Sequence, residues 1–166
     1  MQTNARKLFL LLIVVLASVV TVQAGPYEDA FVAYQRGDYV EAMKFYRLLA
    51  EGGSSYAQRA LGIMYDMGQG VPRDFAEAMK WYRRAADQGD AQAQNNVGLL
   101  LFTGSGVPQN YVEAYKWLTL AVANATDEDG RYLAATNREL VAAKMTAGQI
   151  DQAEKLAAEW TPKAEH

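Results

Sequence analysis

The sequence predicts an all-α fold, a right-handed α-α superhelix (solenoid) of stacked helix pairs. The stretch MGQGVPRDFAEAMKWY, which begins at Met67, returns as TGSGVPQNYVEAYKWL from Thr103, an offset of 36 residues. Apolar residues on both sides of the glycine-rich loop follow helical spacing in each copy. A fixed period of this length is typical of helix pairs that stack, because one pair cannot bury its apolar face alone.

The composition agrees with a packed domain and excludes several classes of protein. Hydrophobic residues make up 51% of the 166 residues and charged residues 21%, which is typical of one globular domain rather than a disordered chain. A net charge of −3 gives no reason to expect a nucleic-acid partner, since such proteins usually carry a basic patch. The absence of cysteine excludes disulfides, thiolate metal sites and cysteine nucleophiles.

Residues 1–24 have the pattern of a secretory signal peptide. Arg6 and Lys7 precede an apolar run over residues 8–20, and Val22 and Ala24 place small residues where signal peptidase reads them. The alternative is an uncleaved membrane anchor, but the run is shorter than the roughly 20 residues that a spanning helix needs. We therefore expect export to the periplasm or the medium, with no stable membrane insertion after cleavage.

The internal repeat divides the remaining chain. Residues 53–88 align with residues 89–124, and both are preceded by a partial copy within an N-terminal helix pair over residues 25–52. We expect residues 125–166 to form C-terminal capping helices. Thirteen positions are identical between the two full copies. They are Gly53/Gly89, Ala57/Ala93, Gln58/Gln94, Gly62/Gly98, Gly68/Gly104, Gly70/Gly106, Val71/Val107, Pro72/Pro108, Glu77/Glu113, Ala78/Ala114, Lys80/Lys116, Trp81/Trp117 and Ala85/Ala121.

Each repeat reads as two capped helices. The spacing predicts a first helix over residues 55–66 and a second over residues 75–87, with Asp74 as the cap of the second. Glycine inside a helix costs about 1 kcal/mol relative to alanine. Because Gly62 and Gly98 recur at the same position, we expect helices to cross closely there. We expect the large side chains Tyr65, Trp81 and Trp117 to fill the space beside them.

The two ends of the stack are predicted from amphipathic spacing. Residues 27–36 form a short helix that pairs with the first partial copy, and residues 129–144 form a helix near the other end. We expect Leu133, Leu140 and Val141 to face inward from that helix. A Thr-x-x-Gln capping box at Thr146 and Gln149 then starts a last helix, with an apolar stripe that ends at Trp160.

These motifs carry a family resemblance. The runs Ala-x-x-x-Leu-Gly-x-x-Tyr, Gly-x-Gly-Val-Pro, Lys-Trp and Ala-Ala-x-x-Gly, read from residue 57 onward, resemble Sel1-like repeats, relatives of the tetratricopeptide repeat. The resemblance covers residues 37–124. The second full copy departs from it at Leu101, where the first has Tyr65, and at its VANATDEDG ending. The resemblance implies a helix-pair solenoid that acts as a scaffold or adaptor.

The sequence offers no residue set for catalysis, cofactor binding or metal binding. His166 is the single histidine and the last residue, which disfavours a zinc site or a catalytic triad. The Gly68-x-Gly70 loop follows a helix rather than a strand, so we interpret it as a repeat turn and not a phosphate loop. Arg36-Gly37-Asp38 spells an adhesion tripeptide, but Asp38 occupies the capping position that Asp74 has one repeat later. Asn124-Ala125-Thr126 fits a glycosylation sequon at a predicted helix end.

The remaining candidate site is the concave surface, which the first helices of successive repeats line in such solenoids. The candidate residues lie opposite the buried stripe of each first helix. They are Tyr56, Arg59, Ile63 and Asp66, followed by Gln92, Asn95, Leu99 and Phe102. Aromatic, arginine and amide side chains are common at protein interfaces. The alternative is that Ile63, Leu99 and Phe102 only pack against the adjoining repeat.

We therefore interpret the chain as a non-catalytic, exported adaptor that holds a protein or peptide in its concave groove, without a cofactor. Two alternatives are an enzyme or regulator of cell-envelope glycan, which the resemblance to a few envelope-linked relatives suggests, and a secreted host-interaction factor. The groove is small with so few repeats, so binding could also involve self-association.

Overall fold

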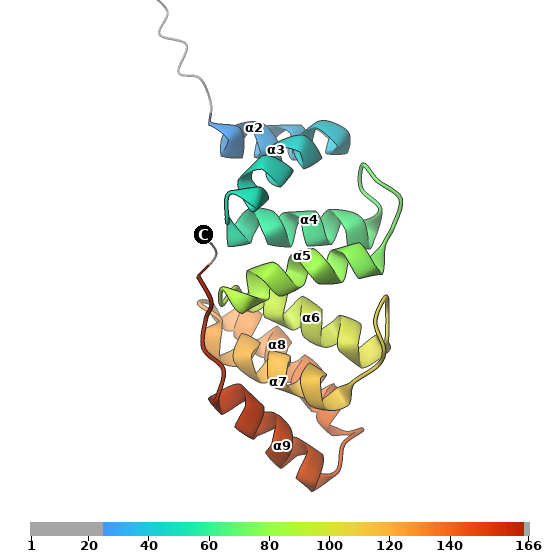
Figure 1. Cartoon of the computed structure of the whole chain (residues 1–166), viewed down its shortest axis with the longest axis vertical. Coiled ribbons are helices and arrows are strands. Elements are labelled where there is room, and N and C mark those ends of the chain that lie inside the picture. The colour runs from blue at the N-terminus through green and yellow to red at the C-terminus, as the bar shows by residue number, and fades with distance from the viewer. Residues whose placement is uncertain (1–24, 165–166) are drawn as a thin grey trace, which may run out of the picture.

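The computed structural model describes residues 25–164, which fold into eight helices and no strand (Figure 1). The helices stack along the long axis of the molecule from α2 to α9, which confirms the predicted all-α solenoid. The first three pairs consist of α2 (Pro26–Gln35) with α3 (Tyr39–Glu51), α4 (Ser55–Met67) with α5 (Phe75–Asp87), and α6 (Ala91–Thr103) with α7 (Tyr111–Asn124). The last two helices are α8 (Glu128–Ala142) and α9 (Ala147–Ala158). The predicted signal peptide lies outside the described residues.

Side-chain caps set the start of each repeat helix. The Asp74 carboxylate accepts the N–H groups of Ala76 and Glu77 at 2.9 and 3.0 Å, which confirms the predicted cap of α5. Asn110 caps α7 in the same way, and the capping box of Thr146 and Gln149 is present at the start of α9. The helix boundaries could be predicted because these short polar side chains act locally.

The helices of one pair cross at the mid-helix glycines, as expected. A Cβ atom added at Gly98 would lie 2.6 Å from Cγ of Leu118, and one added at Gly62 would lie 2.3 Å from the ring of Tyr82. Both separations are too short for a real side chain. The residue that fills the space beside Gly62 is therefore Tyr82 and not its neighbour Trp81, since α5 turns Tyr82 toward α4.

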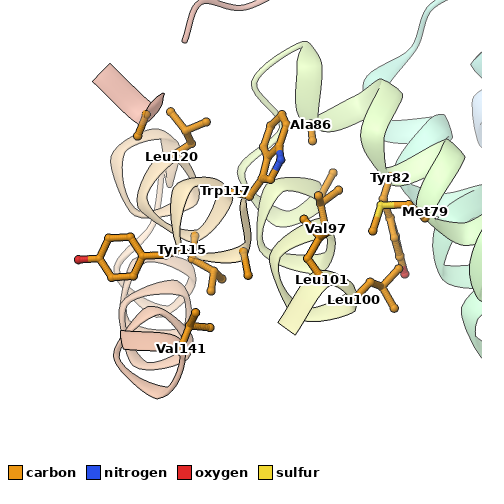
Figure 2. Close-up of a cluster of buried hydrophobic side chains, with 14 of the residues drawn as sticks. Met79, Tyr82, Ala86, Val97, Leu100, Leu101, Tyr115, Trp117, Leu120 and Val141 are labelled. Carbon is orange, nitrogen blue, oxygen red and sulfur yellow. The ribbon is translucent and has the colours of Figure 1, made fainter. Parts of the chain in front are cut away.

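The side chain nearest to Gly98 is Leu118, so the expectation that Tyr65, Trp81 and Trp117 fill the space beside the two glycines was wrong. The two repeated tryptophans also differ in burial, and the one that belongs to the buried core is Trp117. That residue is 1% exposed and lies within the cluster that Figure 2 shows, whereas Trp81 is half-buried, with the Arg84 guanidinium 4.8 Å from the centre of its ring. Trp160 from the C-terminal segment packs edge-on against Trp117, with ring centroids 6.3 Å apart. Trp81 lies one repeat further from this segment.

A buried glutamine joins each helix pair to the one before it, a role that the sequence comparison did not predict. The Gln58 side chain donates to the carbonyl of Ala50 at 3.1 Å, and Gln94 donates to Ala86 at the same distance. Both glutamines are fully buried. Such a group is tolerated in a core only when it is hydrogen-bonded. This explains why a polar residue recurs at a buried position in both full copies.

The second glycine of each Gly-x-Gly loop docks on the preceding helix pair. Gly70 has φ +76°, and a Cβ atom there would lie 2.8 Å from the carbonyl of Tyr39. Gly106 has φ +71° and contacts the backbone of Phe75 as closely. The positive φ and the missing side chain are both needed at this contact. The loop is thus a structural joint between pairs, which agrees with its interpretation as a repeat turn.

The C-terminal helices do not form another pair. Both α8 and α9 pack mainly on α7, so the outer side of α8 stays open. The prediction that Leu133 and Leu140 face inward was wrong, since each is 55% exposed, while Val141 is fully buried as expected. Ala134, which lies seven residues before Val141 on the same side of the helix, is the other buried contact. After α9 the chain runs back along the stack (Figure 1), where the Lys163 N–H donates to the Asp87 carbonyl at 2.8 Å.

Candidate functional site

The first helices α4 and α6, together with α8, line a groove with a volume of about 450 Å³, which we call the amide groove. Its lining includes Arg59 and Ile63 of α4 and Leu133 of α8. The start of α6 and the turn between α7 and α8 also contribute to the lining. The amides that line it belong to Gln92, Asn95, Asn96 and Asn124, which gives the groove its name.

The groove brings together four of the eight predicted site residues, namely Arg59, Ile63, Gln92 and Asn95. Gln92 is exposed and Ile63 is half-buried, while Asn95 is only 7% exposed. The Asn95 Oδ1 accepts a hydrogen bond from Nδ2 of Asn137 at 2.9 Å. Because this bond links α6 to α8, Asn95 contributes to the shape of the groove as well as to its surface.

The other four predicted residues do not line this groove. Tyr56 packs in an aromatic cluster with the ring of Tyr27, 5.1 Å away, and Phe102 packs on the ring of Tyr111 at 5.8 Å. Leu99 is half-buried on α6. Phe102 and Tyr111 belong to the same repeat, so this contact differs from the alternative in which Phe102 packs against the adjoining repeat.

Asp66, the last of the eight predicted residues, forms a hydrogen bond with the buried side chain of Tyr82. Its Oδ2 accepts a hydrogen bond from the Tyr82 hydroxyl at 3.3 Å. Burial of the phenol, together with the nearby Asp66 carboxylate, raises the pKa of Tyr82 well above its ordinary value. The hydroxyl therefore stays protonated and keeps donating to Asp66.

Two of the three charged side chains that line the amide groove, Arg59 and Asp90, form an ion pair. The Arg59 Nε lies 3.1 Å from Oδ2 of Asp90, and the two side chains are only 18% and 13% exposed. Asp90 also caps α6 by accepting the Ala93 N–H at 2.8 Å. The third, Asp127, caps α8 by accepting the Gly130 N–H at 2.7 Å, so the formal charges that line the groove sum to −1.

Sequence reasoning missed Asn124, Asn96 and Leu133 as groove residues. The Nδ2 atom of Asn124 donates to Oε1 of the buried Gln94 at 3.0 Å. Gln88 makes the same bond to Gln58 one repeat earlier, at 2.7 Å. The alignment of the two full repeats places Gln88 at the position of Asn124, and this recurrence of an amide side chain could have pointed to Asn124. The nitrogen that a glycan would occupy at the sequon is thus part of a contact between α6 and α7 within one repeat.

The Arg36-Gly37-Asp38 tripeptide forms a turn between two helices. Gly37 has φ +78°, and the Asp38 carboxylate accepts the Glu41 N–H at 3.2 Å at the start of α3. The positive φ explains why residue 37 is glycine, and the helix cap explains why residue 38 is aspartate. Over residues 25–164, no helix combines the length and the apolar character needed to cross a bilayer.

Comparisons with known proteins agree with this architecture. A sequence profile described as the Sel1 repeat matches residues 29–54, 55–90 and 91–125, which is more than half of the chain. A protective antigen present in uropathogenic Escherichia coli strains, displaying an SLR fold, is 30% identical with a TM-score of 0.74, over 83% of this chain and 30% of that one. A Sel1 repeat protein from Oxalobacter formigenes is 28% identical with a TM-score of 0.63, over 84% of this chain and 55% of that one. This chain therefore spans less than two-thirds of either structure. A comparison with curated proteins finds no match.

Proposed function

Because the chain belongs to the Sel1 repeat family, we propose that it is a non-catalytic, exported adaptor that binds a polypeptide partner in the amide groove. Sel1 repeat proteins are typically scaffolds for protein interactions. The groove lies on the side of the first helices, which forms the concave, ligand-binding surface in solenoids of helix pairs.

The observation that carries this proposal is the chemistry of the groove. Amide side chains present both a donor and an acceptor, as the peptide backbone does, so they can pair with an extended polypeptide. The exposed Leu133 and the half-buried Ile63 offer apolar contacts for one side chain of the partner. Since Arg59 is paired with Asp90 and Asp127 adds one negative charge to the lining, we expect a segment that is not acidic to bind.

Leu133→Arg is the variant that tests the groove. We expect it to abolish retention of the partner from an envelope extract of the source organism, because the arginine would obstruct the groove and place a charge at its apolar end. Leu140→Arg is the matched control, since Leu140 is also 55% exposed on α8 but does not line the groove. The measurement is mass spectrometry of the proteins that each immobilised variant retains.

Loss of the same protein from both variants, or from neither, would contradict the groove assignment. Both variants should melt at the wild-type temperature, since each replaces an exposed residue. A partner that is retained by wild type and by Leu140→Arg, and lost only from Leu133→Arg, would locate the binding surface.

Export is the second part of the proposal and rests on residues 1–24. We expect the protein recovered from cells that express the full sequence to begin at Gly25, in the periplasmic fraction or the medium. Intact-mass spectrometry of each fraction measures this directly. A cytoplasmic protein that retains Met1 or residue 2 as its first residue would show that the segment is not a cleaved signal.

One specific observation favours the alternative of a secreted factor that meets a host. The solved structure from uropathogenic Escherichia coli is that of a protective antigen. Since this chain spans 30% of that protein, the comparison supports exposure to a host only as a proposal. Recovery of the protein from the culture medium rather than the periplasm would favour it.

A further inference from the structure

An open groove of about 460 Å³ follows the outer side of α3, away from the amide groove. Two apolar side chains border it in an exposed position, Val40 at 57% and Leu48 at 61% exposed. Met43 and Val71 complete its apolar lining. We call these four residues the α3 face. Exposed aliphatic residues at positions i and i+8 of one helix form a stripe on one side of it.

The same stripe occurs on α7, 72 residues later, where Val112 and Leu120 occupy the positions of Val40 and Leu48. There it is covered by the chain itself, because α9 packs on α7. Leu120 is 6% exposed, against 61% for Leu48. The Tyr115 hydroxyl, at the position of Met43, donates to Oε1 of Glu154 on α9 at 3.4 Å.

The lysines of the repeat show the same contrast. Lys116 on α7 has a side chain that is 14% exposed, whereas its equivalents Lys44 on α3 and Lys80 on α5 are 68% and 69% exposed. All three form the same ion pair with a glutamate three residues earlier. The difference in exposure therefore comes from what lies above the helix and not from the helix itself.

The stripe is not a requirement of the repeat. On α5, between these two helices, the equivalent residues are Ala76 and Arg84. Arg84 instead extends over the ring of Trp81. Because α5 packs in the stack without an aliphatic pair at these positions, the stacking of the repeats does not explain the pair on α3. The only counterpart among residues 25–164 is the pair on α7, which binds a helix.

We propose that the α3 face docks an amphipathic helix of a partner protein, in the way that α7 docks α9. The occupant would resemble α9, which turns the small residues Ala153 and Ala157 toward the stack. The chain's own α9 is committed to α7, so the helix comes from outside. Lys44, Arg47 and Glu51 border the groove, and Lys44 already pairs with Glu41. A carboxylate on the occupant, placed as Glu154 is on α9, would therefore complement Arg47.

The probe for this surface is a helix-stabilised synthetic peptide with the sequence of residues 145–161, labelled with a fluorophore. It is titrated into the protein purified after expression of the full sequence, and anisotropy is measured. We expect saturable binding that Leu48→Glu weakens at least about tenfold, since it places a charge in the apolar contact. Leu140→Glu, at a similarly exposed leucine on α8, leaves binding unchanged.

Two peptide variants test whether the bound face is that of α9. Ala157→Arg in the peptide should abolish binding, because Ala157 is buried against the stack in the chain, and Gln152→Arg should not, because Gln152 is exposed. Absence of saturable binding would overturn the proposal. Binding that survives Leu48→Glu would also overturn it, because the peptide would then be exchanging with the chain's own α9 on α7. A dimer in sedimentation that Leu48→Glu dissolves would overturn it in favour of a second copy as occupant.

Discussion

Trp117→Ala is expected to lower the free energy of unfolding by about 3–5 kcal/mol, the range for removing a large buried aromatic side chain. Trp117 is 1% exposed and belongs to the buried cluster that Figure 2 shows. It also packs edge-on against Trp160 of the C-terminal segment. Its indole nitrogen has no hydrogen-bond partner among the described residues, so the loss is one of packing. Urea unfolding followed by circular dichroism measures the effect without relying on tryptophan fluorescence.

Trp81→Ala is the matched comparison, because it removes the same side chain at the same repeat position. We expect a loss of at most about 2 kcal/mol, since Trp81 is only half-buried and part of its surface already meets water. Equal losses for the two variants would contradict the difference in packing that the structure shows. The comparison separates the contribution of α9 and its following segment from that of the repeat itself.

Gly62→Ala is expected to destabilise the fold by about 1–3 kcal/mol, although alanine favours a helix over glycine by about 1 kcal/mol. The added Cβ would lie 2.3 and 2.4 Å from two ring carbons of Tyr82. Tyr82 is 2% exposed and held by its hydrogen bond to Asp66, so the ring has little room to move. The crowding therefore outweighs the gain in helix propensity, and thermal unfolding should show a lower melting temperature.

Gly148→Ala provides the control for Gly62→Ala. Gly148 is also helical, but no atom lies within 4 Å of a Cβ added there. Alanine at this position should leave stability unchanged or raise it slightly. If Gly62→Ala proved as stable as Gly148→Ala, the close crossing of α4 and α5 would be refuted.

The helix boundaries could be predicted because their causes are local. Asp74, Asn110 and Thr146 each accept a hydrogen bond from a backbone N–H within three residues, so the sequence contains the whole interaction. The close crossing at Gly62 could be predicted too. Glycine destabilises a helix, so its recurrence at the same position of both repeats indicates that a larger side chain does not fit there. Neither inference required knowledge of which helices meet beyond the repeat.

The candidate site was only partly predictable. The spacing of Arg59, Ile63, Gln92 and Asn95 places them on one side of the first helices, and all four line the amide groove. Leu133 was assigned to the core because helical spacing identifies a stripe of apolar residues but does not show whether that stripe faces the core or the solvent. Whether Leu133 is covered depends on α9, which packs on α7 and leaves α8 open.

The sequence by itself determined the repeating unit of this protein: two capped helices, a glycine-rich joint and a close crossing every 36 residues. Only the tertiary structure decided which equivalent residues are buried, because burial depends on the neighbour and not on the position in the repeat. Leu48 and Leu120 illustrate this, since the same side chain at the same repeat position is 61% exposed on α3 and 6% exposed on α7. The α9 helix packs on α7, and no described helix packs on the outer side of α3 in the same way.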